Sequence, residues 1–298
     1  MKKTLVTILG ALIISAFTAC STQAQVPSPT PSPMIDLTRP GAAKRAVDEL
    51  CTKAGDVDIV RVKITDKAAR LTYVDDWVRP VSLKWENGII TEVDEGTDTV
   101  VSSSFDPKDF NIGDVGQMFR QAGRIAGSYE HQELQITEYS DAKILMTVST
   151  NPESMTVFFR PDASVIAPLN YLVPEGIHAG LAEAIDKAPL ILGAKISAAE
   201  LWVDLKAGPA HIERRIRKNG VPAYHTQRSQ QTDNEEFDPS LIDPQAILTK
   251  VQHMATVSPA HEMPDWTVSI KKPLDSKVEL RYEVDGKVLI TDLEGNEI

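Results

Sequence analysis

Two hydrophobic periods alternate along the chain, and each predicts a different kind of element. Between Ala42 and Ala54 the apolar residues recur at helical spacing, which predicts an amphipathic helix. The following segments, around 60–64, 71–73 and 81–85, alternate apolar and polar residues, which is typical of strands with one buried face. Asn87-Gly88 between two such segments predicts a tight hairpin turn.

This order of one helix followed by alternating strands occurs four times. The predicted helices lie near 42–54, after Pro107, around 176–188 and after Pro239. Short turns between alternating strands indicate antiparallel pairing, and an amphipathic helix is the expected cover for the buried face. The pattern therefore predicts an α+β fold of two tandem similar modules. Each module is an antiparallel β-sheet with amphipathic helices on one face, which makes four α-then-β units.

Two local repeats indicate an internal duplication. Phe105-Asp106-Pro107 recurs as Phe237-Asp238-Pro239, and Asn87-Gly88 recurs as Asn219-Gly220, both 132 residues later. An Asp-Pro pair suits the N-cap and first turn of a helix, so a helix is expected to begin at each pair. In this register the positions Val115, Phe119, Ala122 and Ile125 correspond to Ile247, Val251, Met254 and Val257.

Prolines mark the expected boundary between the two modules. Residues 167–176 contain Pro168 and Pro174, so the first module is predicted over 41–168 and the second over 176–298. The segment Gln227–Glu236 is strongly polar and is expected to be a mobile surface loop, with a partner-binding loop as the alternative.

The first twenty residues have the pattern of an export signal. Two lysines precede an apolar run from Leu5 to Phe17, which is shorter than the ~20 residues that a membrane-spanning helix needs. The run leads into Thr18, Ala19 and Cys20. This segment resembles bacterial lipoprotein precursors, whose lipobox ends in a small residue before the cysteine that becomes lipidated.

The resemblance implies removal of residues 1–19 and a diacylglyceryl thioether on Cys20, often with an N-acyl chain such as palmitate. It places the protein in the bacterial cell envelope, exported and anchored to the outer surface of a membrane. The alternative is a secreted protein cleaved by the ordinary signal peptidase, with Cys20 removed or incidental. Residues 20–40 contain five prolines among Ser, Thr and Gln. This composition predicts a semi-rigid linker up to about 60 Å long.

Charge and cysteine content narrow the possible partners. The formal charge is −11, and it becomes −13 when Lys2 and Lys3 leave with the signal. Phosphate backbones and anionic head groups repel such a surface, so no nucleic-acid partner is expected.

Cys51 is the only cysteine besides Cys20, so it cannot form an internal disulfide in the mature chain. Because Cys51 shares an apolar helical stripe with Val47 and Leu50, it is expected to be a small buried hydrophobe.

No catalytic or metal-binding motif is present in the sequence. Ser-x-x-Lys occurs at Ser140–Lys143 and Ser269–Lys272, but strand geometry points residues three apart to opposite faces. The six histidines, His131, His178, His211, His225, His253 and His261, lack partners at helical spacing. Asp75-Asp76 and Asp94-Glu95 are acidic pairs expected at solvated strand ends, and the pattern leaves the exposure of Trp77 open. The sequence predicts no cofactor, no metal and no catalytic residue.

Three functions remain open. The first, which the sequence favours, is a non-enzymatic binding module of the cell envelope with a protein partner. The second is a carrier that holds a lipid or another hydrophobic ligand in an apolar cavity, and the third is an envelope hydrolase with scattered acidic residues. An apolar pocket of about 300–1,000 Å³ would favour the carrier. A filled core with exposed aromatic residues would favour the binding module, and converging carboxyl groups with raised pKa values would favour the hydrolase.

Overall fold

The computed structural model describes residues 34–94, 103–152, 155–230, 232–255 and 265–298. The predicted signal 1–19, Cys20 and the linker up to residue 33 lie outside these ranges, and so do Glu95 and His261. None of the described helices is long and apolar enough to cross a membrane.

The first half of the described chain contains two helices, one short 3₁₀ turn and seven strands. In chain order they are α1 (Ala42–Ala54), β1 (Asp58–Ile64), β2 (Ala68–Val74), β3 (Pro80–Glu86), β4 (Ile89–Val93), η1 (Pro107–Asp109), α2 (Val115–Ala126), β5 (Glu133–Ser140), β6 (Lys143–Ser149) and β7 (Val157–Phe159).

The second half repeats this order with one additional short strand. Its elements are α3 (Pro174–Ile185), β8 (Gly193–Ser197), β9 (Glu200–Gly208), β10 (His211–Lys218), β11 (Tyr224–Ser229), β12 (Asn234–Glu235), η2 (Pro239–Leu241), α4 (Pro244–Ala255), β13 (Trp266–Pro273), β14 (Glu279–Val284) and β15 (Lys287–Thr291).

The two sheets share one strand order. The first sheet runs β4-β3-β2-β1-β5-β6-β7, and the second runs β11-β10-β9-β8-β13-β14-β15, with β12 paired to β13 outside this path. Neighbouring strands are antiparallel, including the central pairs β1–β5 and β8–β13. The described residues therefore form an α+β fold with two antiparallel sheets and four α-helices, as the sequence predicts at this level.

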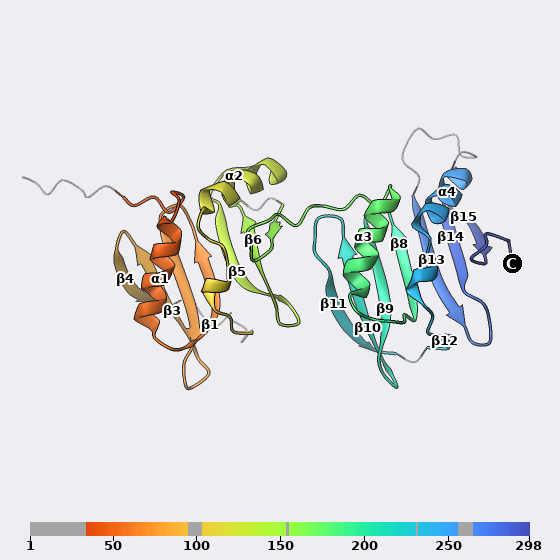
Figure 1. Ribbon diagram of the computed structural model, residues 1–298, viewed down its shortest axis with the longest axis horizontal. Helices are drawn as coiled ribbons and strands as arrows, with labels where there is room; N and C mark the ends of the chain where they lie inside the picture. Colours follow the sequence, from red (N-terminus) through yellow and green to blue (C-terminus); the bar gives the residue numbers. More distant parts are fainter. Residues whose placement is uncertain (1–33, 95–102, 153–154, 231, 256–264) are drawn as a thin grey trace, which may run out of the picture. The chain divides into compact units, whose positions relative to one another are not determined.

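Each sheet has one face covered by helices (Figure 1). Leu50 of α1 and Met118 of α2 are both buried in the first core, together with Leu71 of β2 and Ile136 of β5. In the second core α3 and α4 contribute buried residues in the same way. Burial of aliphatic side chains at about 25 cal/mol per Å² is the main favourable term that holds helix and sheet together.

The predicted linker contains a residue of the core. Leu37 lies within the range 20–40, yet its side chain is fully buried in the first core. Its backbone N–H donates to the Asp66 carbonyl at 2.8 Å, and Asp36 accepts hydrogen bonds from Thr38. The folded unit therefore includes residues before Gly41. The predicted module boundary at 168–176 stays a prediction, although α3 begins at Pro174 within that range.

The prediction that helices begin at the two Asp-Pro pairs is wrong. Asp106 and Asp238 cap the 3₁₀ turns η1 and η2, with the following proline in the first turn. The helix α2 begins eight residues after Pro107, and its cap is Asp114, whose side chain accepts from the Gln117 N–H at 2.8 Å. The Asp-Pro pairs are genuine capping signals, but each caps a separate short 3₁₀ turn.

The predicted helix register is also wrong by three residues. The bounds of α2 and α4 differ by 129 residues, and not by 132. The buried residues Met118, Phe119 and Ala122 therefore correspond to Ile247, Leu248 and Val251. A shift of three residues is nearly one helical turn, so it keeps the same face toward the core and is hard to detect from periodicity.

The prediction of a mobile loop at Gln227–Glu236 is wrong at both of its ends. Gln227, Arg228 and Ser229 belong to the edge strand β11, and Asn234-Glu235 forms β12 against β13. The strand β8 was not predicted, although it lies at the centre of the second sheet. The helix expected at 176–188 is α3, which begins earlier and ends at Ile185.

A buried arginine holds the segment that joins the two halves. The Arg217 side chain is fully buried, and its Nε donates to Glu183 Oε2 at 2.6 Å. One terminal nitrogen donates to the carbonyl oxygens of Asn219 and Val221 at 2.9 and 2.7 Å. The other donates to the carbonyl of Ala167 at 3.3 Å. The guanidinium thereby ties the joining segment, α3 and the β10–β11 turn together.

Candidate functional site

The hairpin between β2 and β3 ends in a loop built around one carboxylate. The backbone N–H groups of Trp77 and Arg79 donate to Asp75 Oδ1 at 2.9 and 2.8 Å. The Arg79 guanidinium donates twice to Asp75 Oδ2, from Nε at 3.0 Å and from Nη2 at 2.8 Å. The Asp75 and Arg79 backbones are also joined, by an N–H···O bond of 3.0 Å. These bonds define the loop conformation from both ends.

The tip of this loop presents two large apolar side chains to solvent. Trp77 is 78 % exposed, the highest fraction among the large apolar side chains of the described residues, and Val78 is 63 % exposed. Val78 has a φ of 58°, a region that β-branched residues rarely enter. Such a conformation costs about 1–3 kcal/mol and persists only where the surrounding structure imposes it. We call residues 75–79 the Trp77 loop.

Hydrogen bonds lower the pKa of Asp75. The Arg79 backbone bond contributes most, followed by the Arg79 side-chain bond. Asp75 is therefore a carboxylate at neutral pH, which lets it accept all of these bonds at once.

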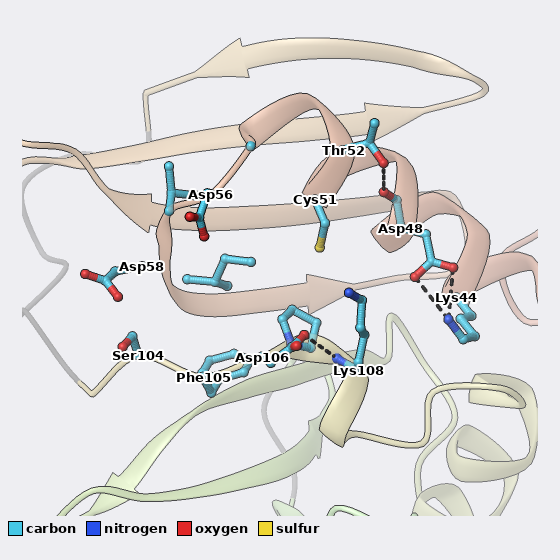
Figure 2. Close-up of a pocket in the computed structure, with 14 residues that line it drawn as sticks. Lys44, Asp48, Cys51, Thr52, Asp56, Asp58, Ser104, Phe105, Asp106 and Lys108 are labelled. Carbon is cyan, nitrogen blue, oxygen red and sulfur yellow. Dashed lines mark hydrogen bonds and ion pairs between the residues drawn. The ribbon is translucent and has the colours of Figure 1, made fainter.

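A hollow of about 620 Å³ opens beside the Trp77 loop. It is lined by Tyr73, Val74, Asp75, Asp76 and Val78 of the hairpin and by Asp56, Val57, Asp58, Val60 and Ser104. It shares Asp56, Val57, Asp58 and Ser104 with a larger hollow of about 900 Å³ at the C-terminal end of α1 (Figure 2). The two hollows form one acidic surface at this end of the first sheet.

Cys51 lies in the larger hollow and is only half buried, so the prediction of a buried residue is wrong. Figure 2 shows its sulfur directed into the hollow, on the side of Lys108. Desolvation raises the pKa of the Cys51 thiol, and the nearby Asp48 and Asp106 raise it further. The group therefore stays a thiol at neutral pH, which is a poor nucleophile and a poor metal ligand.

The acidic groups of the larger hollow already have partners or lie apart. Asp48 pairs with Lys44 at 2.9 Å, and Asp106 accepts the Lys108 backbone N–H at 2.9 Å. No group of three or more His, Cys, Asp or Glu residues is placed to hold a metal ion within the part of the chain that the structure describes. The hollow thus provides shape and negative charge, and we assign it no reaction.

The structure places the other predicted residues on strands and turns. Ser140 and Lys143 face each other across the β5–β6 hairpin, and Ser269 and Lys272 both lie in β13. Neither pair has the helical geometry of an acyltransferase motif.

One histidine has a setting that the sequence did not indicate. His225 Nδ1 lies 3.2 Å from Glu213 Oε1, and its Nε2 lies 3.4 Å from Asp141 Oδ2. His225 and Glu213 come from the paired strands β11 and β10, whereas Asp141 comes from the β5–β6 turn of the first sheet. They line part of a third hollow of about 440 Å³.

Comparison with known proteins does not assign the chain to a family. No family model matches the chain, and no curated protein matches it. Among solved structures the chain is similar to PCNA from Thermococcus kodakaraensis, at 12% identity over 83% of this chain and 94% of that chain. The TM-score is 0.17, and at this value the likeness supports no conclusion about fold or function.

Proposed function

We propose that the chain is a non-enzymatic binding module of the bacterial cell envelope, anchored through Cys20, that engages a protein partner with the Trp77 loop. The observation that carries this proposal is the 78 % exposure of Trp77 on a loop that Asp75 holds in place. Tryptophan is among the residues that dominate binding energy at protein interfaces. A loop ordered before binding loses less conformational entropy when the complex forms.

The lining of the hollows favours this function over a carrier. The two larger hollows are open and lined by carboxylates. Asp56 and Asp58 line both of them, Asp48 and Asp106 line the larger one, and Asp75 and Asp76 line the one beside the Trp77 loop. An apolar ligand would desolvate these carboxylates without offering them a partner, which is costly. The apolar interior of the described chain is instead filled by packed side chains from helices and strands.

We further infer that the two halves arose by duplication of a module with two α-then-β units. Their shared strand order supports this, and so does one long-range backbone bond that is repeated. The Phe105 N–H donates to the Ile59 carbonyl, and the Phe237 N–H donates to the Ile191 carbonyl, each at 2.9 Å. Both donors and both acceptors are 132 residues apart, the offset of the Phe-Asp-Pro repeat.

Site-specific cross-linking tests the proposed function. A photoreactive amino acid would replace Trp77 in the full chain, expressed in a bacterial envelope. The matched control places it at Leu274, which is 64 % exposed in the β13–β14 turn of the second half. We expect discrete protein adducts from position 77 that the control does not give. Adducts shared equally by both positions, or none from position 77, would contradict the proposal.

A second measurement separates the binding module from the carrier. Native mass spectrometry of the full chain should show no bound lipid beyond a covalent modification of Cys20. A stoichiometric, non-covalent lipid adduct would support the carrier instead.

A further inference from the structure

Four cations lie together on the face of the first sheet that is opposite its helices. Lys63 of β1 pairs directly with Arg70 of β2, and Arg70 pairs directly with Lys84 of β3. Arg61 lies two residues before Lys63 and therefore on the same face of β1. The core residues Val62 and Leu71 point to the other face. We call Arg61, Lys63, Arg70 and Lys84 the basic row.

This arrangement is unfavourable for the isolated protein. Like charges directly opposite each other on paired strands destabilise a sheet. Two carboxylates flank the row: Glu86 accepts from Lys84 Nζ at 2.7 Å and also attracts Arg70, and Glu133 lies 4.0 Å from Lys63. The Nε of Arg61 is buried and has no hydrogen-bond partner among the described residues. The row thus concentrates four cations on one sheet face of a chain whose formal charge is −11.

The second sheet shows that the fold does not require these cations. Lys195 of β8 pairs with Trp202 of β9, and Trp202 pairs with Ile216 of β10. These three residues stand 132 positions after Lys63, Arg70 and Lys84, on the corresponding strands. Of these three positions in the second sheet, only the one equivalent to Lys63 carries a cation, and the second sheet still has the same strand order. On that face of the second sheet a cation stands elsewhere, at Arg214 of β10, which lies over the Trp202 ring and pairs with Asp204 at 2.8 Å. The positions of the basic row are therefore not a requirement of the fold.

We propose that the basic row is a docking surface for a short, extended acidic segment of a protein partner. Alternate residues of an extended peptide are about 6.6–7 Å apart, the spacing of Arg61 and Lys63 along β1. Cations on neighbouring strands are about 4.8 Å apart and reach carboxylates on the same side of the peptide. Arginine and lysine at such a surface form charge-assisted hydrogen bonds with carboxylates.

The flanking carboxylates favour a short peptide over a long polyanion. Glu86 and Glu133 carry negative charge beside the row, and the rest of the protein has an excess of acidic groups. A long chain of phosphates that continued beyond the row would meet repulsion from these groups. A segment with a few carboxylates is able to stay within the row.

A peptide titration tests this proposal on the full chain in a neutral detergent. The probe is a fluorescein-labelled peptide of alternating Glu and Thr, followed by fluorescence anisotropy. We expect saturable binding that weakens as salt is raised, because partly exposed charges are screened. The double variant Arg70→Gln/Lys84→Gln should lose about tenfold or more in affinity. The matched control Lys44→Gln/Lys67→Gln removes two cations of the same half outside the row and should change affinity less than about twofold.

Three results would overturn the proposal. They are no saturable binding of the peptide, an equal loss in both double variants, and tighter row-dependent binding of polyphosphate with the same charge. The thermal midpoint of the Arg70→Gln/Lys84→Gln protein should change little, because relieved repulsion offsets the loss of partly exposed ion pairs, which contribute little. Measuring it alongside the titration separates loss of folding from loss of binding. Trp77→Ala should leave the titration unchanged, which separates this test from that of the proposed function.

Discussion

At the scale of single residues, Asp75 has the largest influence on the candidate site. Its carboxylate organises the loop that exposes Trp77, and its lowered pKa shows that the folded loop favours the charged form. A group whose folded pKa is depressed adds stability above its unfolded pKa, and this stability is lost as the pH falls through the folded value. The loop should therefore loosen only below the usual Asp pKa of 3.8.

Amide hydrogen exchange checks this prediction. Protection factors of the Trp77 and Arg79 amides, corrected for intrinsic exchange rates, should be constant near neutral pH and fall below pH 3.8. Asp75→Asn should lower both protection factors at pH 7, because a neutral amide is a weaker acceptor for the Arg79 guanidinium. Asp76→Asn is the matched control, since Asp76 accepts none of the bonds described for this loop. Equal effects of the two variants would contradict the role given to Asp75.

Little of this residue-level detail could be predicted from sequence. The sequence predicts Asp75-Asp76 only as a solvated pair at a strand end, and it leaves the exposure of Trp77 open. The two aspartates are identical in sequence terms, and they differ only because the turn geometry aims one carboxylate at two backbone N–H groups. Cys51 shows the same limit. Its helical stripe was identified correctly, but the hollow beside it depends on segment 104–108, which is distant in sequence.

At the scale of elements, the β10–β11 turn depends on one buried cation. Removing the Arg217 side chain would leave Glu183 and several carbonyl oxygens without their donor. Breaking a buried ion pair by deleting one partner typically costs about 3–5 kcal/mol. Glu183 is a third exposed, so we expect Arg217→Ala to lower the free energy of unfolding by about 3 kcal/mol, toward the low end of that range.

Chemical denaturation measures this loss. The exposed Lys206 of β9 serves as the control, because Lys206→Ala removes a cation at the surface and should change stability by less than about 0.5 kcal/mol. A change below about 1 kcal/mol for Arg217→Ala would contradict the anchoring role of Arg217.

Element boundaries were predictable where local sequence decides them. The helix expected at Ala42–Ala54 has those bounds in α1, because its apolar stripe ends at Gly55. The start of α2 was missed because Asp106-Pro107 carries a genuine capping signal for η1. The strand β8 was missed because Gly193, Ala194 and Lys195 have weak strand preference. It is a strand because β9 and β13 pair with it on both sides.

At the scale of the whole molecule, the sequence predicts two antiparallel sheets, but it does not predict the central strand pair that joins the two parts of each sheet. Hairpins follow from turns between neighbouring strands, whereas β1–β5 and β8–β13 join strands separated along the chain by three or more others. The basic row depends on the same information. Its four cations are spread over 61–84, and only the register of three strands places them side by side.

The proposed anchor gives a prediction at this scale. Replacing Cys20 with Ala should abolish incorporation of radiolabelled fatty acid and leave unprocessed precursor, because the cysteine supplies the thiol that is lipidated. Cys51→Ala is the control and should keep normal labelling. Unchanged labelling of the Cys20→Ala protein would rule out the anchor.

The burial of Leu37 has a mechanical consequence. A chain held from its N-terminal side meets the fold at Ile35, whose N–H donates to Asn87 Oδ1 at 3.2 Å, and then at Leu37, whose N–H donates to the Asp66 carbonyl between β1 and β2. Tension along the proposed anchor would therefore load the first core directly, through the Leu37 side chain and the turns beside it. The loaded end would be the half of the molecule that carries both the Trp77 loop and the basic row. A pull on a partner bound at either surface would then be transmitted to the proposed anchor through the first sheet.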